Sequence, residues 1–407
     1  MHSKYVLLAF LMLMLHAASS QNISSSPYSV FGIGMMNGRS SSLTRSLGGT
    51  GIGVQSEYNL NPINPASYGS IVSPISHIYE IGLNVETNRY QTSDRSDSKT
   101  AGGLSNINYW FKFKPWWSAS LGLAPFSSVS YDIQTSRNLG VISDVGYDFN
   151  GSGNINQLYL GNAFTITKNF SVGFHASYLF GSITKAESMI TNLTTLTLEN
   201  KIVARKLTLD FGAQYKIKVG EKKSLIIGVI ADNGLSMNGQ VTSSLYNDEA
   251  DTLATEKGRT KKYTLPKAAG VGLSLQTPRH LFASDLKFEN WQNASLPDVS
   301  LQDTWRFSAG YMYKGNPESQ TYLGMTSLRT GFYVQNYHLN IKGNNFPAWG
   351  VSMGISIPVF DGKSSINLTY LLDQLGTTND NLILQRSQKL MLDVVIRDLW
   401  GIKRKFD

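Results

Sequence analysis

A strict alternation of apolar and polar side chains, sustained over long segments, constrains this chain most. From Leu207 to Ile217 every odd position is apolar and every even position is small or polar. The same period of two returns at 170–180, 269–276, 305–314, 349–357 and 390–396. Successive side chains of a β-strand point to opposite faces, so each segment has one apolar and one polar face. The pattern predicts an all-β fold.

The length of the alternating segments decides between two all-β architectures, a soluble sandwich and a barrel that crosses a membrane. Sandwich strands run about 5–6 residues, whereas a tilted membrane strand needs about 9–11. The segment 198–219 is longer than either. Tryptophans also gather near the ends of the expected strands, as an interfacial girdle requires; they are Trp110, Trp116, Trp117, Trp291, Trp305, Trp349 and Trp400. We therefore predict a transmembrane antiparallel β-barrel.

The composition agrees with this prediction and excludes several other classes of protein. Charged residues make up 16% of the chain, against roughly 25% in ordinary soluble domains. The absence of Cys excludes a disulfide framework, thiolate metal sites and cysteine nucleophiles. A net charge of +8 without Lys/Arg-rich runs does not indicate a nucleic-acid partner.

Residues 1–20 have the pattern of a secretory signal peptide. Lys4 supplies the basic region, 7–15 the apolar core, and Ala18-Ser19-Ser20 a small-residue cleavage site. The apolar core is too short to span a bilayer, which needs roughly 20 residues. We expect an exported protein that begins at Gln21.

The barrel is expected to occupy residues 77–407. Its strands are predicted near 77–90, 99–113, 116–132, 152–167, 170–186, 198–218, 223–239, 263–276, 280–292, 304–314, 321–337, 347–359, 364–374 and 386–400. That makes about fourteen, an even number as in bacterial single-chain barrels. The connections between them are alternately short and long, which predicts short periplasmic turns, seven long external loops and periplasmic termini.

The segment 21–76 before the first strand lacks strong alternation and is rich in Gly, Ser and Asn. A phosphate-binding glycine loop is excluded, because no Lys-Ser/Thr follows the glycines and no βαβ unit surrounds them. Two interpretations remain: a flexible periplasmic tail, and a hatch folded into the lumen. We favour the hatch, since Gly permits close backbone approach and Asn-Pro fixes tight bends.

Short motifs in this segment and in a later strand carry a family resemblance. Gly48-Gly49-Thr50-Gly51, followed by Asn64-Pro65-Ala66, resembles the N-terminal signature of the FadL family of outer-membrane transport proteins. A strand near the C-terminal end of that family's sequences is similar to Leu328-Arg329-Thr330-Gly331-Phe332-Tyr333. The stretch 26–34 resembles a version common in Bacteroidetes, whereas Ser67 stands where many members have Gly.

The resemblance implies a barrel closed by an N-terminal hatch, through which small hydrophobic, fatty-acid-like molecules pass and leave by a lateral gap. It makes Gly48, Gly49, Gly51, Asn64, Pro65 and Ala66 the candidate gating or ligand-binding residues. It also implies outer-membrane lipid as the surroundings and no enzymatic activity, cofactor or metal. The closing strand at 390–396 with Trp400 and Phe406 resembles the signal that the barrel-assembly machinery reads for insertion.

Three alternative functions stay open. The first is a non-transporting accessory barrel subunit of an outer-membrane assembly or secretion complex. The second is a general polar porin, disfavoured by the expected hatch. The third is a barrel hydrolase, although no Ser/His/acid constellation is evident.

Two further features have an ordinary and a functional interpretation. His175 lies on a polar strand face and is expected to be a solvated lumenal residue. The acidic run 248–251, followed by Lys257, Arg259, Lys261 and Lys262, is expected to be a solvated external loop. The alternative interpretation of this stretch is a binding site for a partner protein or for a metal ion.

Overall fold

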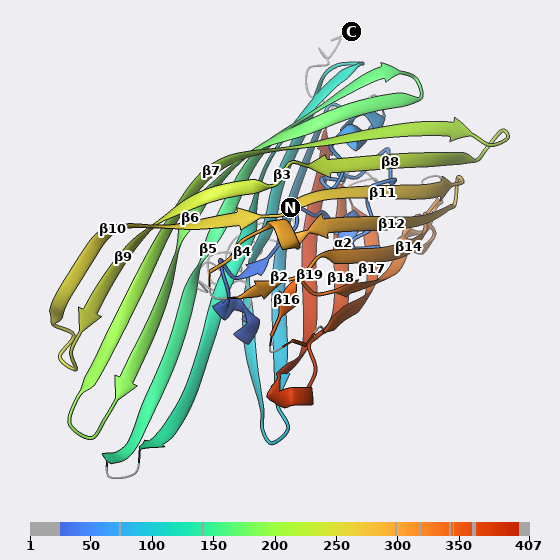
Figure 1. Cartoon of the computed structure of the whole chain (residues 1–407). Helices are drawn as coiled ribbons and strands as arrows, with labels where there is room; N and C mark the ends of the chain where they lie inside the picture. The colour runs from blue at the N-terminus through green and yellow to red at the C-terminus, as the bar shows by residue number, and fades with distance from the viewer. Residues whose placement is uncertain are drawn as a thin grey trace, which may run out of the picture.

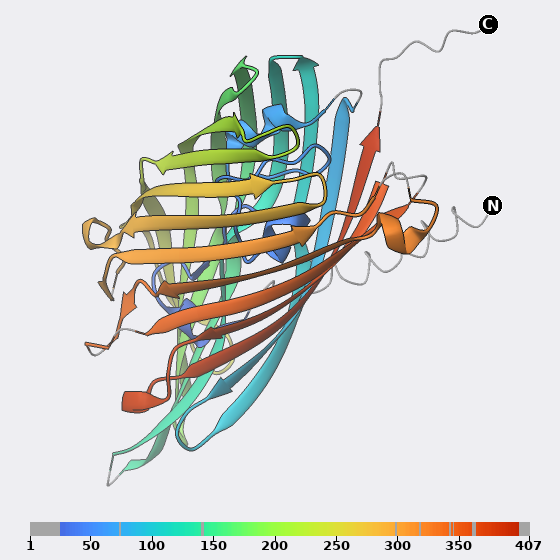
Figure 2. The ribbon, with the colours of Figure 1, turned by 90° about the vertical axis from the view of Figure 1, so that its right-hand side faces the viewer.

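The computed structural model describes residues 25–72, 75–139, 142–297, 299–316, 319–341, 343–344, 346–359 and 364–398. The predicted signal peptide, Trp400 and Phe406 lie outside these residues. The described chain is nearly all β and forms a closed antiparallel barrel of fourteen strands, which confirms the predicted fold (Figures 1 and 2).

Two of the fourteen barrel strands are each interrupted once, β8 with β9 and β10 with β11. The barrel strands are β2 (His77–Gln91), β3 (Ser96–Lys114), β4 (Trp117–Leu139), β5 (Ile142–Thr167), β6 (Phe170–Ile190), β7 (Thr195–Lys218), β8 (Ser224–Asp232), β9 (Leu235–Tyr246), β10 (Thr252–Leu265), β11 (Lys267–Gln276), β12 (His280–Asn290), β14 (Thr304–Tyr313), β15 (Ser327–Asn336), β17 (Pro347–Val359), β18 (Ser364–Leu375) and β19 (Leu384–Asp398). β19 closes the barrel on β2 in a register that runs from Asp398↔His77 to Leu384↔Gln91.

The remaining elements are short. The N-terminal segment holds η1 (Pro27–Val30), β1 (Met35–Met36), α2 (Ser42–Ser46) and η2 (Pro65–Ser70). The connections hold η3 (Trp291–Asn293), β13 (Ser300–Leu301), α3 (Tyr322–Met325), β16 (Leu339–Asn340) and η4 (Asn379–Asn381). The strand predicted to begin at 321 therefore starts later, because α3 is capped by the Thr321 side chain and occupies 322–325.

The period of two separates an outward apolar face from an inward polar face. On β7 the outward Leu209, Phe211 and Tyr215 are exposed, whereas the inward Asp210 and Gln214 are buried. Trp116, Trp305 and Trp349 are exposed on the outside, as predicted for a girdle. Trp110 and Trp291 depart from that prediction: both are buried and pack in apolar clusters inside the molecule.

The two ends of the barrel differ in their connections. At one end, here called the turn end, lie the paired residues His77 and Asp398 and the tight β3–β4 and β5–β6 turns. At the other, the hairpin end, the β4–β5, β6–β7 and β9–β10 hairpins extend far past the neighbouring strands (Figure 1). Much of 135–151, 188–199 and 240–262, predicted as loops, is therefore strand. These stretches are polar because they lie past the apolar outward band, so the alternation that marks a membrane strand is missing.

Candidate functional site

The described part of the N-terminal segment, residues 25–72, passes through the lumen from one end of the barrel to the other (Figure 2). Tyr28 lies at the hairpin end, where it packs against Tyr337 and Phe346 of a long connection. Pro65 and Ala66 lie near the opposite end, against the glycines of β6 and β7. These residues are buried, so the segment fills the lumen rather than trailing from it.

The Gly48–Gly51 motif is seated on the wall formed by β12, β14, β15 and β17. Gly48 N–H donates to Ser352 Oγ at 2.9 Å, and Gly51 N–H donates to Asp285 Oδ2 at 2.6 Å. A Cβ at Gly331 would lie 2.1 Å from the Leu47 carbonyl carbon, so the segment and the wall touch backbone to backbone. Gly49 packs beside Arg306, whose Nη2 donates to Gly48 O at 3.1 Å.

The Asn64-Pro65-Ala66 motif begins η2 and is seated on a different wall. Asn64 Oδ1 caps η2 by accepting from Ala66 N–H at 3.1 Å. A Cβ at Gly173 of β6 would lie 2.7 Å from the Pro65 carbonyl carbon. Asn64 Nδ2 also donates to Ile52 O at 2.8 Å, which links this motif to the end of the glycine motif. The structure thus joins the two predicted groups, and in it they anchor the segment to opposite sides of the lumen.

A buried ionic cluster, which sequence reasoning missed, fixes Arg39 of the segment to β6 and β7. Arg39 Nη2 contacts Asp210 Oδ2 at 2.5 Å, and His175 Nδ1 contacts Asp210 Oδ1 at 2.9 Å. The Tyr68 hydroxyl lies 3.0 Å from His175 Nε2. His175 is fully buried, so the prediction of a solvated residue was wrong: the N-terminal segment covers the polar face on which it lies.

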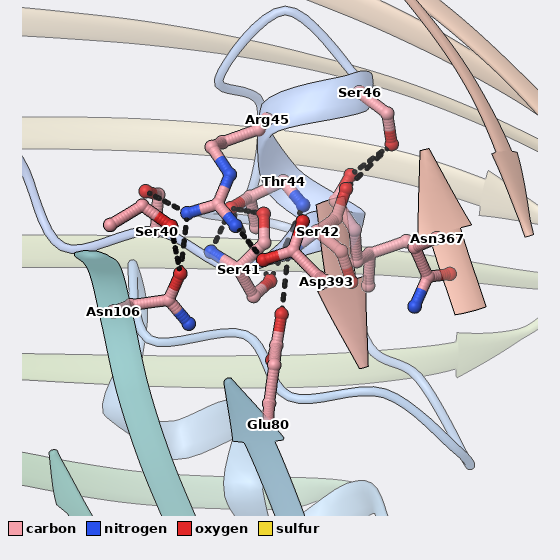
Figure 3. A network of polar contacts seen from close by, with 12 residues as sticks. Ser40, Ser41, Ser42, Thr44, Arg45, Ser46, Glu80, Asn106, Asn367 and Asp393 are labelled. Carbon is pink, nitrogen blue, oxygen red and sulfur yellow. Dashed lines mark hydrogen bonds and ion pairs between the residues drawn. The ribbon is translucent and has the colours of Figure 1, made fainter. Parts of the chain in front are cut away.

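A second buried cluster surrounds Arg45 of α2 (Figure 3). Arg45 forms an ion pair with Asp393 of β19 and donates from Nη1 to Asn106 Oδ1 at 2.8 Å. Glu80 of β2 accepts from the Ser42 N–H at 2.7 Å. Arg39 and Arg45 are the only basic residues within 25–72. That scarcity was the signal available in the sequence, but it does not identify the carboxylates that pair with them.

The barrel wall opens between β3 and β4 towards the hairpin end. The β3–β4 register runs from Lys114↔Trp117 only as far as Ile107↔Leu123, and Figure 1 shows the β2–β3 hairpin diverging from the β4–β5 hairpin. Pro125 lies just past this point on β4. A proline has no N–H to donate, so it is confined to strand edges and bulges.

The N-terminal segment covers part of this edge of β4. β1 pairs with it through Met35↔Ser128 and Met36↔Ser127. Asn37 N–H donates to Phe126 O at 2.8 Å, and Ser26 N–H donates to Ser130 O at 2.9 Å. The same segment that fills the lumen therefore also hydrogen-bonds to the opening in the wall.

The lumenal cavity left beside the segment has a mixed lining of charged and apolar side chains. It measures about 260 Å³ and is lined by charged groups that already have partners. Lys389 Nζ lies 2.7 Å from Glu86 Oε2, Tyr333 donates to Asp373 at 2.7 Å, and the Arg306 guanidinium lies 3.7 Å from the Tyr333 ring centre. A larger apolar hollow of about 550 Å³ lies on the outward face, among exposed side chains such as Leu273, Phe282 and Phe332.

Helices and metal sites were assessed over the described ranges only. Within them no helix is both long and apolar enough to span a membrane. The described residues also contain no group of three or more His, Asp or Glu side chains arranged to hold a metal ion.

Comparison with known proteins gives one family and one fold. A family model described as BamG matches residues 1–407. No curated protein sequence matches the chain. A Pseudomonas aeruginosa FadL homologue superposes with a TM-score of 0.61 at 11% identity, covering 89% of this chain and 99% of that one. The P. putida toluene transporter TodX superposes with a TM-score of 0.59 at 16% identity, covering 89% of this chain and 99% of that one. The Ralstonia pickettii toluene transporter TbuX superposes with a TM-score of 0.58 at 12% identity, covering 88% of this chain and 98% of that one.

Proposed function

The chain belongs to the BamG family, and from this premise we propose that it is a closed accessory barrel of an outer-membrane assembly or secretion complex. It sits in the outer membrane of a Gram-negative bacterium, of the Bacteroidetes type suggested by residues 26–34, and transports nothing itself. The N-terminal segment 21–76 acts as a permanent plug within the barrel 77–407. The partners are outer-membrane lipid and the other proteins of the complex.

The membrane location is supported by the outward face of the barrel. Side chains such as Phe211 of β7, Leu273 of β11 and Phe282 of β12 are about half exposed. Monomeric soluble proteins rarely expose contiguous apolar patches larger than a few hundred Å². Lipid satisfies such a face, and the closed ladder leaves few backbone groups without partners in the hydrocarbon.

The observation that best supports a closed barrel is a pair of ionic anchors, a largely buried one at Arg39 and a buried one at Arg45. Each arginine comes from the N-terminal segment, and each carboxylate, Asp210 or Asp393, comes from the barrel wall. Removing one partner of a buried ion pair leaves the other charge uncompensated, which typically costs about 3–5 kcal/mol. A plug held at two such points stays in place during ordinary thermal motion, which suits a structural subunit better than a channel.

Transport of a small hydrophobic molecule is the second candidate. The opening between β3 and β4 favours it, and the neighbours of similar fold are a FadL homologue and two toluene transporters. Against it, the lumenal cavity beside the plug is small, about 260 Å³, and three charged side chains, Arg45, Glu86 and Lys389, stand among its lining. Ligand sites for apolar molecules are lined mainly by hydrophobic and aromatic side chains.

Purification from the native outer membrane in mild detergent, followed by mass spectrometry of co-purifying proteins and lipids, tests the proposal. We expect other membrane proteins in stoichiometric amounts. A lone barrel that carries an apolar small molecule would favour transport. A second test places the protein in liposomes loaded with a small solute and compares the wild type with the double variant Arg39→Met, Arg45→Met. The wild type should retain the solute, and the variant should leak it. Leakage through the wild type would contradict a closed barrel.

A further inference from the structure

β10 forms a free edge of the sheet that extends past the barrel at the hairpin end. It pairs with β9 along its whole length, from Thr252↔Tyr246 to Leu265↔Leu235. On its other side the described residues provide one backbone pairing, an isolated bridge between Thr264 and Ser295. The neighbouring strand β12 ends at Asn290, and the chain then turns inward, where Trp291 stacks on His338 with ring centres 4.2 Å apart. The strand that would continue the ladder beside β10 is thus diverted.

The bridge reveals which backbone groups face the free edge. Thr264 N–H donates to Ser295 O at 2.8 Å, and Ser295 N–H donates to Thr264 O at 2.9 Å. In an antiparallel strand the N–H and C=O of alternate residues point to the same side. The backbone groups of Lys262 and Thr260 therefore face the same edge, whereas those of 261 and 263 face β9. All residues from 252 to 262 are exposed, so this edge is open to an incoming strand.

The charge along this edge is strongly one-sided. Within 252–262, Lys257, Arg259, Lys261 and Lys262 are accompanied by one acidic residue, Glu256, which pairs loosely with Arg259 at 3.8 Å; the acidic residues of 248–251 lie in the turn before the strand. Lysines at an edge can simply discourage aggregation. Here, however, eleven consecutive exposed residues follow one another along the edge, which is enough to pair with a whole partner strand.

We propose that this edge of β10 binds an extended, Asp/Glu-rich segment of a partner protein, which adds to the sheet as an antiparallel strand. Main-chain hydrogen bonds to 260 and 262 supply affinity, as in other cases of strand addition. The four basic side chains select acidic partners. The ladder groups favour a polypeptide over anionic lipid headgroups, which would use the charges alone. This inference rests on the proposed accessory role and specifies where one partner attaches.

The test uses the full-length barrel in detergent micelles and two fluorescent ten-residue peptides, one alternating Glu and Thr, the other alternating Lys and Thr. We expect the acidic peptide to bind and the basic one not to bind. Thr260→Pro with Lys262→Pro removes two edge donors while leaving the 261 and 263 N–H groups on β9, and should weaken binding about tenfold or more. Thr260→Ala, which keeps the N–H, should change binding little.

A charge-reversal variant separates the contribution of the basic side chains from that of the main-chain hydrogen bonds. It also keeps the inference testable if the proline variant misfolds. Lys257→Glu with Arg259→Glu should abolish binding of the acidic peptide and allow the basic peptide to bind. The matched control is Lys201→Glu with Lys206→Glu on β7, where both residues are exposed; Lys201 is paired with both β6 and β9, and Lys206 is paired with β6. Far-ultraviolet circular dichroism establishes that each variant keeps its sheet content.

Two results would overturn the inference. One is no binding of the acidic peptide to the folded wild type. The other is a combined result: the acidic peptide no longer binds the charge-reversal variant, it still binds the proline variant, and the wild type binds dioleoylphosphatidylglycerol vesicles. That combination would identify a surface for lipid headgroups. The accessory role is judged separately: if wild type and proline variant co-purify with the same partners, the edge inference fails and the role stands. If the wild type has no partners, the role fails whatever the peptides show.

Discussion

Arg45 of α2 and Asp393 of β19 form an ion pair that is buried on both sides, with 8% of the arginine side chain and none of the aspartate side chain exposed. The two residues are 348 positions apart in the sequence. One belongs to the N-terminal segment and the other to the last strand of the barrel. The pair therefore fastens the N-terminal segment to the same strand that closes the barrel.

Breaking this pair from one side should destabilise the protein strongly. For Arg45→Met we expect a loss of about 3–5 kcal/mol in the free energy of unfolding, because Asp393 then stays buried without its partner. Arg45→Met with Asp393→Leu should recover much of the loss. Urea unfolding in micelles measures both. Lys99→Ala, which breaks the exposed Lys99–Asp132 pair, is the control and should cost no more than about 1 kcal/mol.

The close contact between Gly331 and Leu47 predicts that even one added methyl group will displace the plug. In Gly331→Ala the new Cβ would meet the Leu47 backbone, which has no flexible end to move aside. We expect faster proteolysis within 42–54 than in the wild type. Mass spectrometry of the fragments measures it. Gly38→Ala is the matched control, because nothing lies within 4 Å of its added Cβ. Equal proteolysis of the two variants would show that this contact does not hold the segment.

The pairing of β1 with β4 predicts an efficient engineered cross-link. Met35 and Ser128 are directly opposite each other, and antiparallel partners have Cα separations of about 4.5–5.5 Å, within the range of a disulfide. Met35→Cys with Ser128→Cys should oxidise readily, with no native Cys to compete. Met35→Cys with Ser118→Cys is the unpaired control.

This cross-link also separates the two candidate functions. If the barrel is a closed accessory subunit, the locked variant should support growth and co-purify with its partners as the wild type does. If the opening between β3 and β4 has to release a ligand, the locked variant should lose uptake and regain it on reduction.

His338 predicts a pH dependence of the apolar cluster at the hairpin end, formed by Tyr28, Tyr337 and Phe346 and here called the cap, because its ring contacts Tyr337. Burial lowers the pKa of His338 to about 4, against an opposing effect of Glu289. An unfolded His titrates near 6.5, so the open form binds the proton more readily. The closed cap should be fully stable above about pH 6.5 and weaken as the pH falls towards 4. Hydrogen exchange of 337–341 should accelerate over this range.

The matched variant for this prediction is His338→Gln, which removes the titrating ring. It should exchange at a rate that does not depend on pH between 6.5 and 4, once the intrinsic chemical rate is corrected for. The same acceleration in the variant would assign the effect to another group.

How far the sequence could predict the fold depends on how local each feature is. The alternation at 207–217 marks β7 because the two faces of one strand meet different solvents. Residues 252–262 of β10 carry no such mark: both faces of that stretch are exposed, and the predicted strand begins only at 263. The sequence therefore predicted the membrane strands and missed the extension of the hairpins.

The candidate site shows the same limit. Gly48, Gly51 and Asn64 were identified because glycines and Asn-Pro have a strong local meaning, and they do lie where the segment touches the walls. The partners of Arg39 and Arg45 could not be found, since each arginine had many carboxylates to choose from. Trp110 and Trp291 were misplaced because proximity to a strand end does not specify which face a side chain occupies.

The sequence by itself determined that this chain forms a barrel of about fourteen strands, because a period of two is written residue by residue along each strand. The tertiary structure alone decided what fills the barrel, which carboxylates hold the plug, and where the ladder is left open between β3 and β4 and along β10. Those features depend on contacts between residues far apart in the chain. Such contacts exist only after the barrel has closed, so no local pattern encodes them.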